Sequence, residues 1–413
     1  MERRVAITGI GWMTPLGWGV EPVWEALLKG RSGVGPISLF DAANYGSRVA
    51  GEVPDFDPSA WMDARSARRL DRFSQFSIAA ATMAISDGGI DLDDVDPYRK
   101  GALMGSGAGG IGTIEEGQTR LLNRGPAKVP PLSIPKMMIN AGAFVVASQY
   151  NLRGPGFAVV SACSTGAVAI TQAASFIRSG TADVMVAGGA EASITPLSIA
   201  SFCACGAITR RDDGDPAAAS RPFDLSRDGF VMAEGAGVLL LEDMEHAKAR
   251  GARIYAELAG WGLTNDAYHV TAPEPSSEPA ARSITDALAM AGEAPASVGY
   301  VNAHGTGTPL NDPAETHSIR LALGEEADRV PVSSTKSMTG HMLGAAGAVE
   351  AAIAAMAVST RRVPPTINVT EQDPACDLDV VTEGARDMGD GAIALSNSFA
   401  FGGHNVCLAV RRI

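Results

Sequence analysis

The sequence contains few cysteines for its length, five among 413 residues, and the number is odd. They stand at positions Cys163, Cys203, Cys205, Cys376 and Cys407. So few thiols in so long a chain exclude the disulfide framework that staples small secreted domains. Cys203 and Cys205 are two positions apart with no matching His or Cys cluster nearby, so we expect no metal site.

Long apolar runs and positive charge are also in short supply. No uninterrupted apolar stretch has membrane-spanning length, and the N-terminus lacks the apolar segment and cleavage site of a signal peptide. Basic residues number 33 against 46 acidic ones, for a net charge of −13, whereas phosphate binding requires a basic footprint. We therefore expect a cytoplasmic protein that binds neither membranes nor nucleic acid.

Glycine, in contrast, is abundant, with 47 residues, and much of it lies where an apolar strand gives way to a helix. Such strand ends occur in residues 4–17, 182–196, 298–309, 329–341 and 392–405. Alanine-rich stretches with helical spacing occupy residues 75–87, 164–178, 279–292 and 347–358. Strands alternating with helices predict an α/β fold with parallel sheets covered on both faces. Without a low-complexity linker, we expect two closely packed halves, residues 1–253 and 254–413.

Cys163 has a distinctive position, between the apolar stretch "FAVVSA" and a helix of small residues. A free cysteine is most often a buried structural residue. A thiol at the N-terminus of a helix has a pKa below its ordinary value of about 8.5, which favours the nucleophilic thiolate. The small neighbours Ala162 and Ser164 leave room for a substrate. Position alone leaves both roles open.

Two of the six histidines stand just past strand ends, His304 in "VNAHGTGTPLND" and His341 in "SSTKSMTGHMLGAAGAVE". Strand ends are where α/β proteins place their chemistry, although each residue also suits a loop or a helix cap. Glu350 falls inside an apolar helix, where burial of an unpaired carboxylate is costly. It requires a partner, and Lys336 is the nearest basic candidate, with a solvated surface lysine as the alternative.

A glycine-containing loop follows a strand in "NSFAFGGHN" and comprises Phe399, Ala400, Phe401, Gly402 and Gly403. Its backbone N–H groups are unobstructed, and glycine adopts conformations that other residues resist. Such a loop suits an oxyanion hole, although taken alone it is equally typical of an ordinary turn.

Together these motifs resemble the elongating β-ketoacyl-(acyl carrier protein) synthases of the thiolase-like fold, type II. The resemblance extends over essentially the whole chain. It is carried, in order, by "SACSTGA", "RPFDLSRDGFVMAEGAGVLLLEDMEHAKARGA", "NAHGTGTPLNDPAE", "SSTKSMTGHMLGAAGAVEA" and "NSFAFGGHN". It implies two duplicated βαβ halves packed as layers in the order α/β/α/β/α, and a dimer with active sites near the subunit interface.

The resemblance also implies the chemistry. Cys163 would be the acyl-carrying nucleophile, His304 and His341 the active-site histidines, and Lys336 and Glu350 their supporting residues. The implied reaction is the decarboxylative Claisen condensation of malonyl-carrier protein with an acyl group on Cys163. This acyltransferase would extend the chain by two carbons in fatty acid biosynthesis, without a metal or redox cofactor.

Further site features follow from the same resemblance. The oxyanion hole would use the N–H groups of Cys163 and Phe401, with residues 399–403 as the gating loop. Ala400 replaces a glycine of the usual loop, which adds roughly 1 kcal/mol if gate opening requires a positive φ there. Ala108 stands where family members limited to medium chains carry a bulkier residue, so we expect a deeper acyl pocket.

For carrier-protein docking, Arg65, Arg68 and Arg69 have the spacing of one helical face. The resemblance places Lys128 near the same entrance. Such a patch on an acidic enzyme can steer an acidic carrier protein, or it can be an ordinary solvated face. Gly206 occupies a site where related enzymes often have arginine, which predicts weaker docking or a different carrier protein.

Other functions remain open at this stage. The main alternative is the catalytic ketosynthase subunit of a type II polyketide or polyene synthase, paired as a heterodimer with a chain-length factor. A non-catalytic chain-length factor itself is disfavoured by Cys163, His304 and His341 together. A thiolase would use a second cysteine as base, and a cysteine hydrolase would need a water path that no motif indicates.

Overall fold

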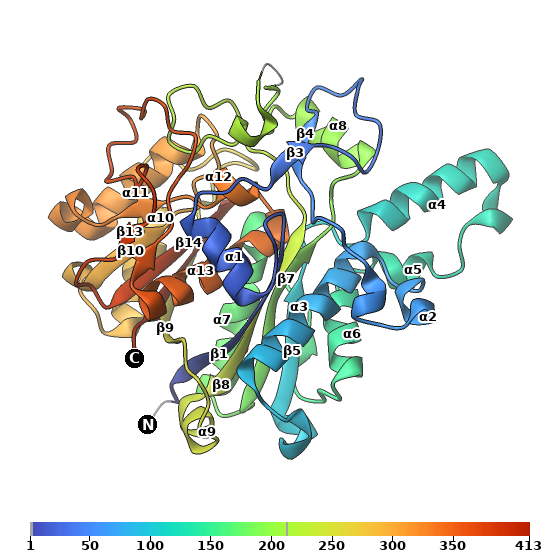
Figure 1. The fold of residues 1–413 in the computed structure, drawn as a ribbon, viewed down its shortest axis with the longest axis horizontal. Helices are drawn as coiled ribbons and strands as arrows, with labels where there is room; N and C mark the ends of the chain where they lie inside the picture. Colours follow the sequence, from blue (N-terminus) through green and yellow to red (C-terminus); the bar gives the residue numbers. More distant parts are fainter. Residues whose placement is uncertain (1–2, 212–213) are drawn as a thin grey trace.

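The computed structural model describes residues 3–211 and 214–413. Its main sheet has 11 strands: two five-stranded halves joined edge to edge, and the short strand β2 (Gly17–Trp18), which pairs with β1 (Figure 1). The first half contains β1 (Val5–Thr14), β5 (Lys100–Gly105), β6 (Gly156–Phe157), β7 (Val184–Glu191) and β8 (Gly235–Asp243). The second contains β9 (Ala256–Asn265), β10 (Val298–Asn302), β11 (Val332–Ser333), β14 (Ile393–Ala400) and β15 (His404–Arg411).

The two halves repeat one topology. The first has the order β6-β5-β7-β8-β1 and the second β11-β10-β14-β15-β9. In each, the second strand runs parallel to both its neighbours, and the last two pairings are antiparallel. The halves meet through a short antiparallel contact, in which Ala6 pairs with Glu257 and Ile7 with Ala256. This correspondence is the duplication expected from the resemblance.

Helices form three layers around the two halves of the sheet. These are α3 (Arg72–Gly88), α6 (Ala141–Gln149), α7 (Thr165–Arg178), α10 (Glu278–Ala291), α11 (Asn311–Leu323) and α13 (Ala346–Thr360). Helices α7 and α13 lie against each other between the halves and contact strands of both (Figure 1). Helices α3 and α6 cover the first half, and α10, with α11 against it, covers the second. The layers are therefore α/β/α/β/α, as expected.

Small residues allow the two central helices to approach closely. A Cβ added to Gly166 would lie 2.8 Å from the backbone nitrogen of Ala348, and one added to Gly347 would lie 3.0 Å from that of Ala167. The segment Leu343–Thr360 is long and apolar enough to span a membrane, although Glu350 interrupts it, and 89% of it is buried inside the protein. This segment, which ends in α13, forms part of the core.

Shorter elements complete the fold. The remaining helices are α1 (Val20–Leu28), α2 (Ala64–Ala67), α4 (Ile111–Arg124), α5 (Ser133–Met137), α8 (Pro196–Ala204), α9 (Met244–Ala249) and α12 (Lys336–Thr339). The remaining strands are β2 (Gly17–Trp18), β3 (Val34–Pro36), β4 (Val49–Gly51), β12 (Arg362–Val363) and β13 (Arg386–Asp387). Helices α4 and α5 project from the body of the molecule (Figure 1).

The division of the chain into two halves at residue 253 stays a prediction.

The predicted helices match α3, α7, α10 and α13 closely. Helix α3 begins three residues before the predicted position because the Asp71 side chain accepts a hydrogen bond from Phe73 N and caps it. The strand expected in "FAVVSA" was too long. Only Gly156 and Phe157 pair with β5, so the chain leaves the sheet well before Cys163.

Candidate active site

Cys163 lies in a tight turn, Ala162–Ser164, that leads directly into α7. Ala162 has a φ of +48°, a conformation that residues other than glycine rarely adopt. Thr165 Oγ1 accepts a 2.9 Å hydrogen bond from Ser161 N and so fixes the turn from its other side. The turn places Cys163 in the wall of a cavity of about 470 Å³.

The pKa of Cys163 contradicts the sequence expectation. Burial raises the pKa of the thiol to about 12, although the positive charge of Lys336 and the Phe401 backbone N–H, which donates to the sulfur, oppose the rise. The helix N-terminus therefore does not offset desolvation, and the resting group is a thiol. Because Phe401 N–H already points at the sulfur, the two residues expected to form the oxyanion hole are adjacent.

The cavity brings together most of the residues predicted from the sequence. Its lining includes Ala108, Cys163, His304, His341, Phe399, Ala400 and Phe401. Lys336 and Glu350 do not line it, and both are almost fully buried. Ala108 is therefore part of the cavity wall, while its proposed effect on chain length stays a prediction.

Lys336 fixes the position and tautomer of His304. Its Nζ donates a 2.6 Å hydrogen bond to His304 O and lies 3.4 Å from His304 Nδ1. An ammonium group has no lone pair, so Nδ1 must be the unprotonated ring nitrogen. His304 consequently carries its hydrogen on Nε2.

His341 lies against His304, with ring centroids 5.4 Å apart and planes 85° apart. Its backbone N–H donates to Val231 O at 2.7 Å, and its carbonyl accepts from Ala233 N at 2.9 Å. Burial, followed by the charge of Lys336, lowers the pKa of both histidines well below 6.5. Both imidazoles are therefore neutral at pH 7.

Lys336 and Glu350 form the ion pair expected from the sequence, and both side chains are at most 3% exposed. Burial raises the pKa of Glu350 to about 7, while Lys336 opposes the rise. The interaction explains how α13 accommodates a carboxylate in its apolar interior. It also holds the ammonium group beside His304.

A second buried carboxylate, which sequence reasoning missed, supports the His304 loop from α11. Glu315 accepts 2.7 Å hydrogen bonds from the backbone N–H groups of His304 and Gly305. Burial raises its pKa to about 7, and these two hydrogen bonds oppose the rise. Glu315 belongs to the motif "NDPAE", but only the fold shows that its carboxylate accepts hydrogen bonds from the backbone of His304, eleven residues earlier.

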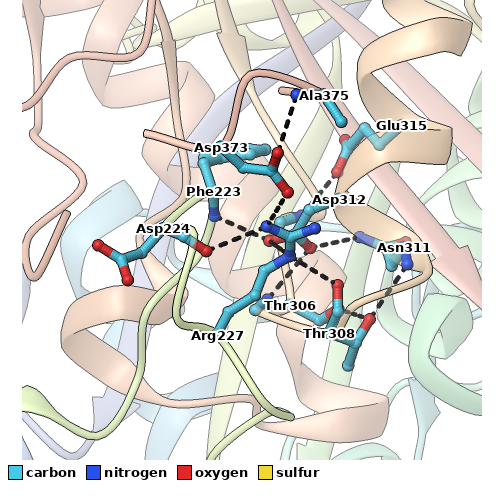
Figure 2. Close-up of polar contacts among 12 residues, drawn as sticks. Phe223, Asp224, Arg227, Thr306, Thr308, Asn311, Asp312, Glu315, Asp373 and Ala375 are labelled. Atoms are coloured by element: carbon cyan, nitrogen blue, oxygen red, sulfur yellow. Dashed lines mark hydrogen bonds and ion pairs between the residues drawn. The ribbon is translucent and has the colours of Figure 1, made fainter. Parts of the chain in front are cut away.

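Figure 2 shows a polar network that extends this support. Asp312 accepts from Phe223 N at 2.9 Å and from Gly307 N at 3.1 Å. Arg227 donates to Thr308 O at 3.1 Å and forms a 2.6 Å ion pair with Asp373. The "RPFDLSRDGF" segment thereby holds the loop after β10 in one position beside the cavity.

The loop between β14 and β15 forms another side of the cavity. Ala400 pairs with His404 in the ladder, so it takes an extended conformation in which alanine causes no strain. Gly402 and Gly403 have φ values of +85° and +70°. A Cβ at Gly403 would lie 2.6 Å from that of Asp266, so this position requires glycine. Any cost at Ala400 would arise only when the loop opens.

The predicted docking residues are all exposed, and none lines the cavity. The expected helical face was wrong in detail. Helix α2 is a single turn that ends at Ala67, so only Arg65 lies within it, and Arg68 and Arg69 follow its end. Lys128 lies in a separate turn, Pro126–Lys128, after the projecting helix α4.

Comparison with known proteins identifies the family. The model of the β-ketoacyl synthase N-terminal domain matches residues 2–247, and that of the C-terminal domain matches residues 255–370. The chain belongs to the β-ketoacyl synthase family. The 3-oxoacyl-[acyl-carrier-protein] synthase 2 of Synechocystis sp. is 46% identical to this β-ketoacyl synthase, over 100% of this chain and 98% of the relative.

Solved structures agree with this assignment. The ishigamide ketosynthase/chain length factor superposes on this β-ketoacyl synthase with a TM-score of 0.93 at 36% identity, and the match covers both chains completely. A type II polyketide synthase complex, in which an acyl carrier protein is bound to its hexaketide-loaded ketosynthase, gives the same values. The predicted fold, family and acyltransferase class are therefore confirmed.

Proposed function

We propose that this β-ketoacyl synthase condenses malonyl-carrier protein with an acyl group held on Cys163, and so elongates fatty acids by two carbons. The observation that carries the proposal is a single cavity lined by the Cys163 thiol and two neutral imidazoles. The curated relative that acts as a 3-oxoacyl-[acyl-carrier-protein] synthase supports the choice of substrates.

In the first half-reaction, the Cys163 sulfur attacks the thioester of an acyl-carrier protein. Because burial raises the thiol pKa, the proton must leave as the C–S bond forms, and neutral His341 offers a nitrogen lone pair in the same cavity. The N–H groups of Cys163 and Phe401 stabilise the tetrahedral oxyanion. The carrier-protein thiol leaves, and the acyl chain stays on Cys163.

In the second half-reaction, malonyl-carrier protein loses CO₂ and becomes an enolate. His304 donates from Nε2, since Lys336 occupies its Nδ1 side, and His341 donates beside it. The enolate carbon attacks the acyl-Cys163 thioester, and the sulfur is expelled as a thiolate that takes a proton from water to return to the resting thiol. Loss of CO₂ drives the condensation. The two imidazoles stabilise the enolate, and the N–H groups of Cys163 and Phe401 stabilise the tetrahedral oxyanion.

We also propose that the protein works as a homodimer through the face that carries β6 and the projecting helices. This face exposes apolar side chains that suit burial against a second copy. They are Leu121, Leu122, Leu132, Ile134, Met138, Phe144, Phe157 and Val160. Strand β6 is also an edge strand, free to pair with another. Sedimentation should give twice the 42.5 kDa chain mass.

A second candidate is the catalytic subunit of a type II polyketide or polyene synthase that pairs with a chain-length factor. The 0.93 TM-score to a ketosynthase/chain length factor supports it. Mass spectrometry of products from the purified protein, given malonyl-carrier protein and acyl-carrier proteins of several lengths, separates the candidates. Elongation by the protein alone supports the homodimeric synthase, whereas activity only after a partner is added contradicts it.

Two further features belong to the same proposal. The protein would act in the cytoplasm. The chain would divide into halves at residues 1–253 and 254–413. The interval between the two matched family regions, residues 247 to 255, supports a division there.

Ala108→Phe should shorten the products. The phenyl ring would fill part of the cavity that an acyl chain enters, so kcat/KM for long acyl chains should fall about tenfold or more. Short chains, which stop before this position, should react within about twofold of the parent rate. Product lengths are measured by mass spectrometry, with Ala108→Gly as the control, and an unchanged distribution would rule out Ala108 as a depth determinant.

Arg68→Glu should weaken docking of the acidic carrier protein. Charge reversal on this exposed patch should raise KM for acyl-carrier protein about fivefold at low salt, with kcat unchanged. Reaction with a small acyl-pantetheine thioester should not change, because it lacks the protein surface. Arg282→Glu on α10 is the control, and equal KM values for the two variants would place docking elsewhere.

A further inference from the structure

Two buried hydroxyl groups interrupt the otherwise apolar side of the cavity. Phe202, Phe230 and Leu343 line it with carbon, and they pack in a cluster with Cys163. Ser193 and Ser198 line the same cavity and are only 1% and 7% exposed. A pocket that receives only saturated hydrocarbon has no use for such groups, since an alkyl chain removes water from them without replacing its hydrogen bonds.

Ser193 is oriented so that only its lone pairs are available. Its Oγ donates a 2.7 Å hydrogen bond to Glu191 Oε1. Glu191 is fully buried and also accepts from Gly107 N at 2.7 Å and Gly344 N at 3.0 Å. Because these donors hold the carboxylate in place, the Ser193 hydrogen is committed to it. Towards the cavity, Ser193 is an acceptor.

Ser198 has the opposite character. It lies in the first turn of α8, where its backbone N–H donates to Thr195 Oγ1 at 3.3 Å. Its own Oγ accepts from Thr195 Oγ1 at 3.0 Å. The hydroxyl hydrogen of Ser198 has no acceptor among residues 3–211 and 214–413. Towards the cavity, Ser198 is therefore a donor.

From this pairing we infer that the preferred acyl chain carries a hydroxyl group, which donates to Ser193 and accepts from Ser198. The inference rests on the proposed function, because it concerns the chain that Cys163 holds. A hydroxyl group has both the hydrogen that Ser193 can accept and the lone pair to which Ser198 can donate, whereas a ketone has only the lone pair and a saturated chain has neither. The serines are then specificity-determining residues of the acyl pocket.

The test compares decanoyl-carrier protein with hydroxydecanoyl-carrier proteins that carry the hydroxyl group at successive carbons. At one position, kcat/KM should exceed that of decanoyl by about tenfold or more, because the plain chain offers no donor to the Ser193 lone pairs and no acceptor to the Ser198 hydrogen. Ser198→Ala and Ser193→Ala should each reduce this preference severalfold and should raise kcat/KM for decanoyl. Ser201→Ala is the matched control, since Ser201 is exposed on the same helix and does not line the cavity.

The possible outcomes distinguish the preference for a hydroxylated chain from the proposed condensing activity. Elongation of decanoyl with equal or lower rates for every hydroxylated chain would overturn the inference and leave the proposed function intact. A preference that survives both serine variants would also overturn it, because other groups would then bind the hydroxyl. If no acyl chain is elongated, the proposed function fails first. Should Ser198→Ala not fold, as judged by circular dichroism, Ser193→Ala alone decides.

Discussion

Cys163→Ala should abolish chain elongation, with a loss on the order of 10⁴-fold or more in kcat/KM, because it removes the sulfur to which the Phe401 N–H donates, and the other thiol in the cavity lining, Cys205, is exposed. Release of CO₂ from malonyl-carrier protein should continue, since that step depends on His304 and His341. The added space left by the sulfur gives malonyl its own access to the imidazoles. Product mass spectrometry and trapping of labelled CO₂ measure the two activities separately.

The control for this variant is Cys376→Ala, which makes the same change at a buried thiol that does not line the cavity. It should elongate chains within about twofold of the parent, with a modest loss of stability from the removed sulfur. Residual elongation by Cys163→Ala near the parent rate would show that another nucleophile carries the chain.

His304→Ala should have the opposite pattern. Decarboxylation and elongation should both fall about 10²- to 10³-fold, because one of two donors to the developing enolate oxygen is removed. Acylation of Cys163 in the absence of malonyl-carrier protein should be less affected, since the Cys163 and Phe401 N–H groups still stabilise that intermediate. Quenched-flow measurement of acyl-enzyme formation, beside steady-state CO₂ release, distinguishes the two steps.

A companion variant tests the support of the His304 loop. Glu315→Gln keeps one acceptor oxygen, which can accept from His304 N, but it removes the charge and places an NH2 group opposite Gly305 N. Its loss should therefore be smaller than that of His304→Ala. Equal losses in both variants would mean that the loop conformation, and not the imidazole, limits the rate.

Local patterns in the sequence were enough to predict many of the residues that line or support the cavity. The turn-to-helix pattern at Cys163 and the strand ends before His304 and His341 singled out these residues as candidates, and the family resemblance implied their roles. The cost of burying Glu350 in an apolar helix was sufficient to pair it with Lys336. These predictions succeeded because each depends on interactions within or next to one element.

The rest depends on the three-dimensional fold. The thiol pKa was expected to fall and instead rises, because burial is set by surrounding elements that the helix position does not reveal. The bonds of Glu315 and Arg227 to the His304 loop join separate elements, so no spacing rule indicates them. In the sequence, Ser198 is typical of a residue in the first turn of a helix. Only the structure shows that it lines the cavity, where its hydroxyl group can donate a hydrogen bond.

The most direct measurement is the mass of the peptide that contains Cys163 after incubation with acyl-carrier protein alone. The account predicts that this peptide gains the mass of one acyl group, that hydroxylamine removes it, and that malonyl-carrier protein discharges it as a product two carbons longer. An unmodified Cys163 peptide from enzyme that still elongates chains would contradict the account.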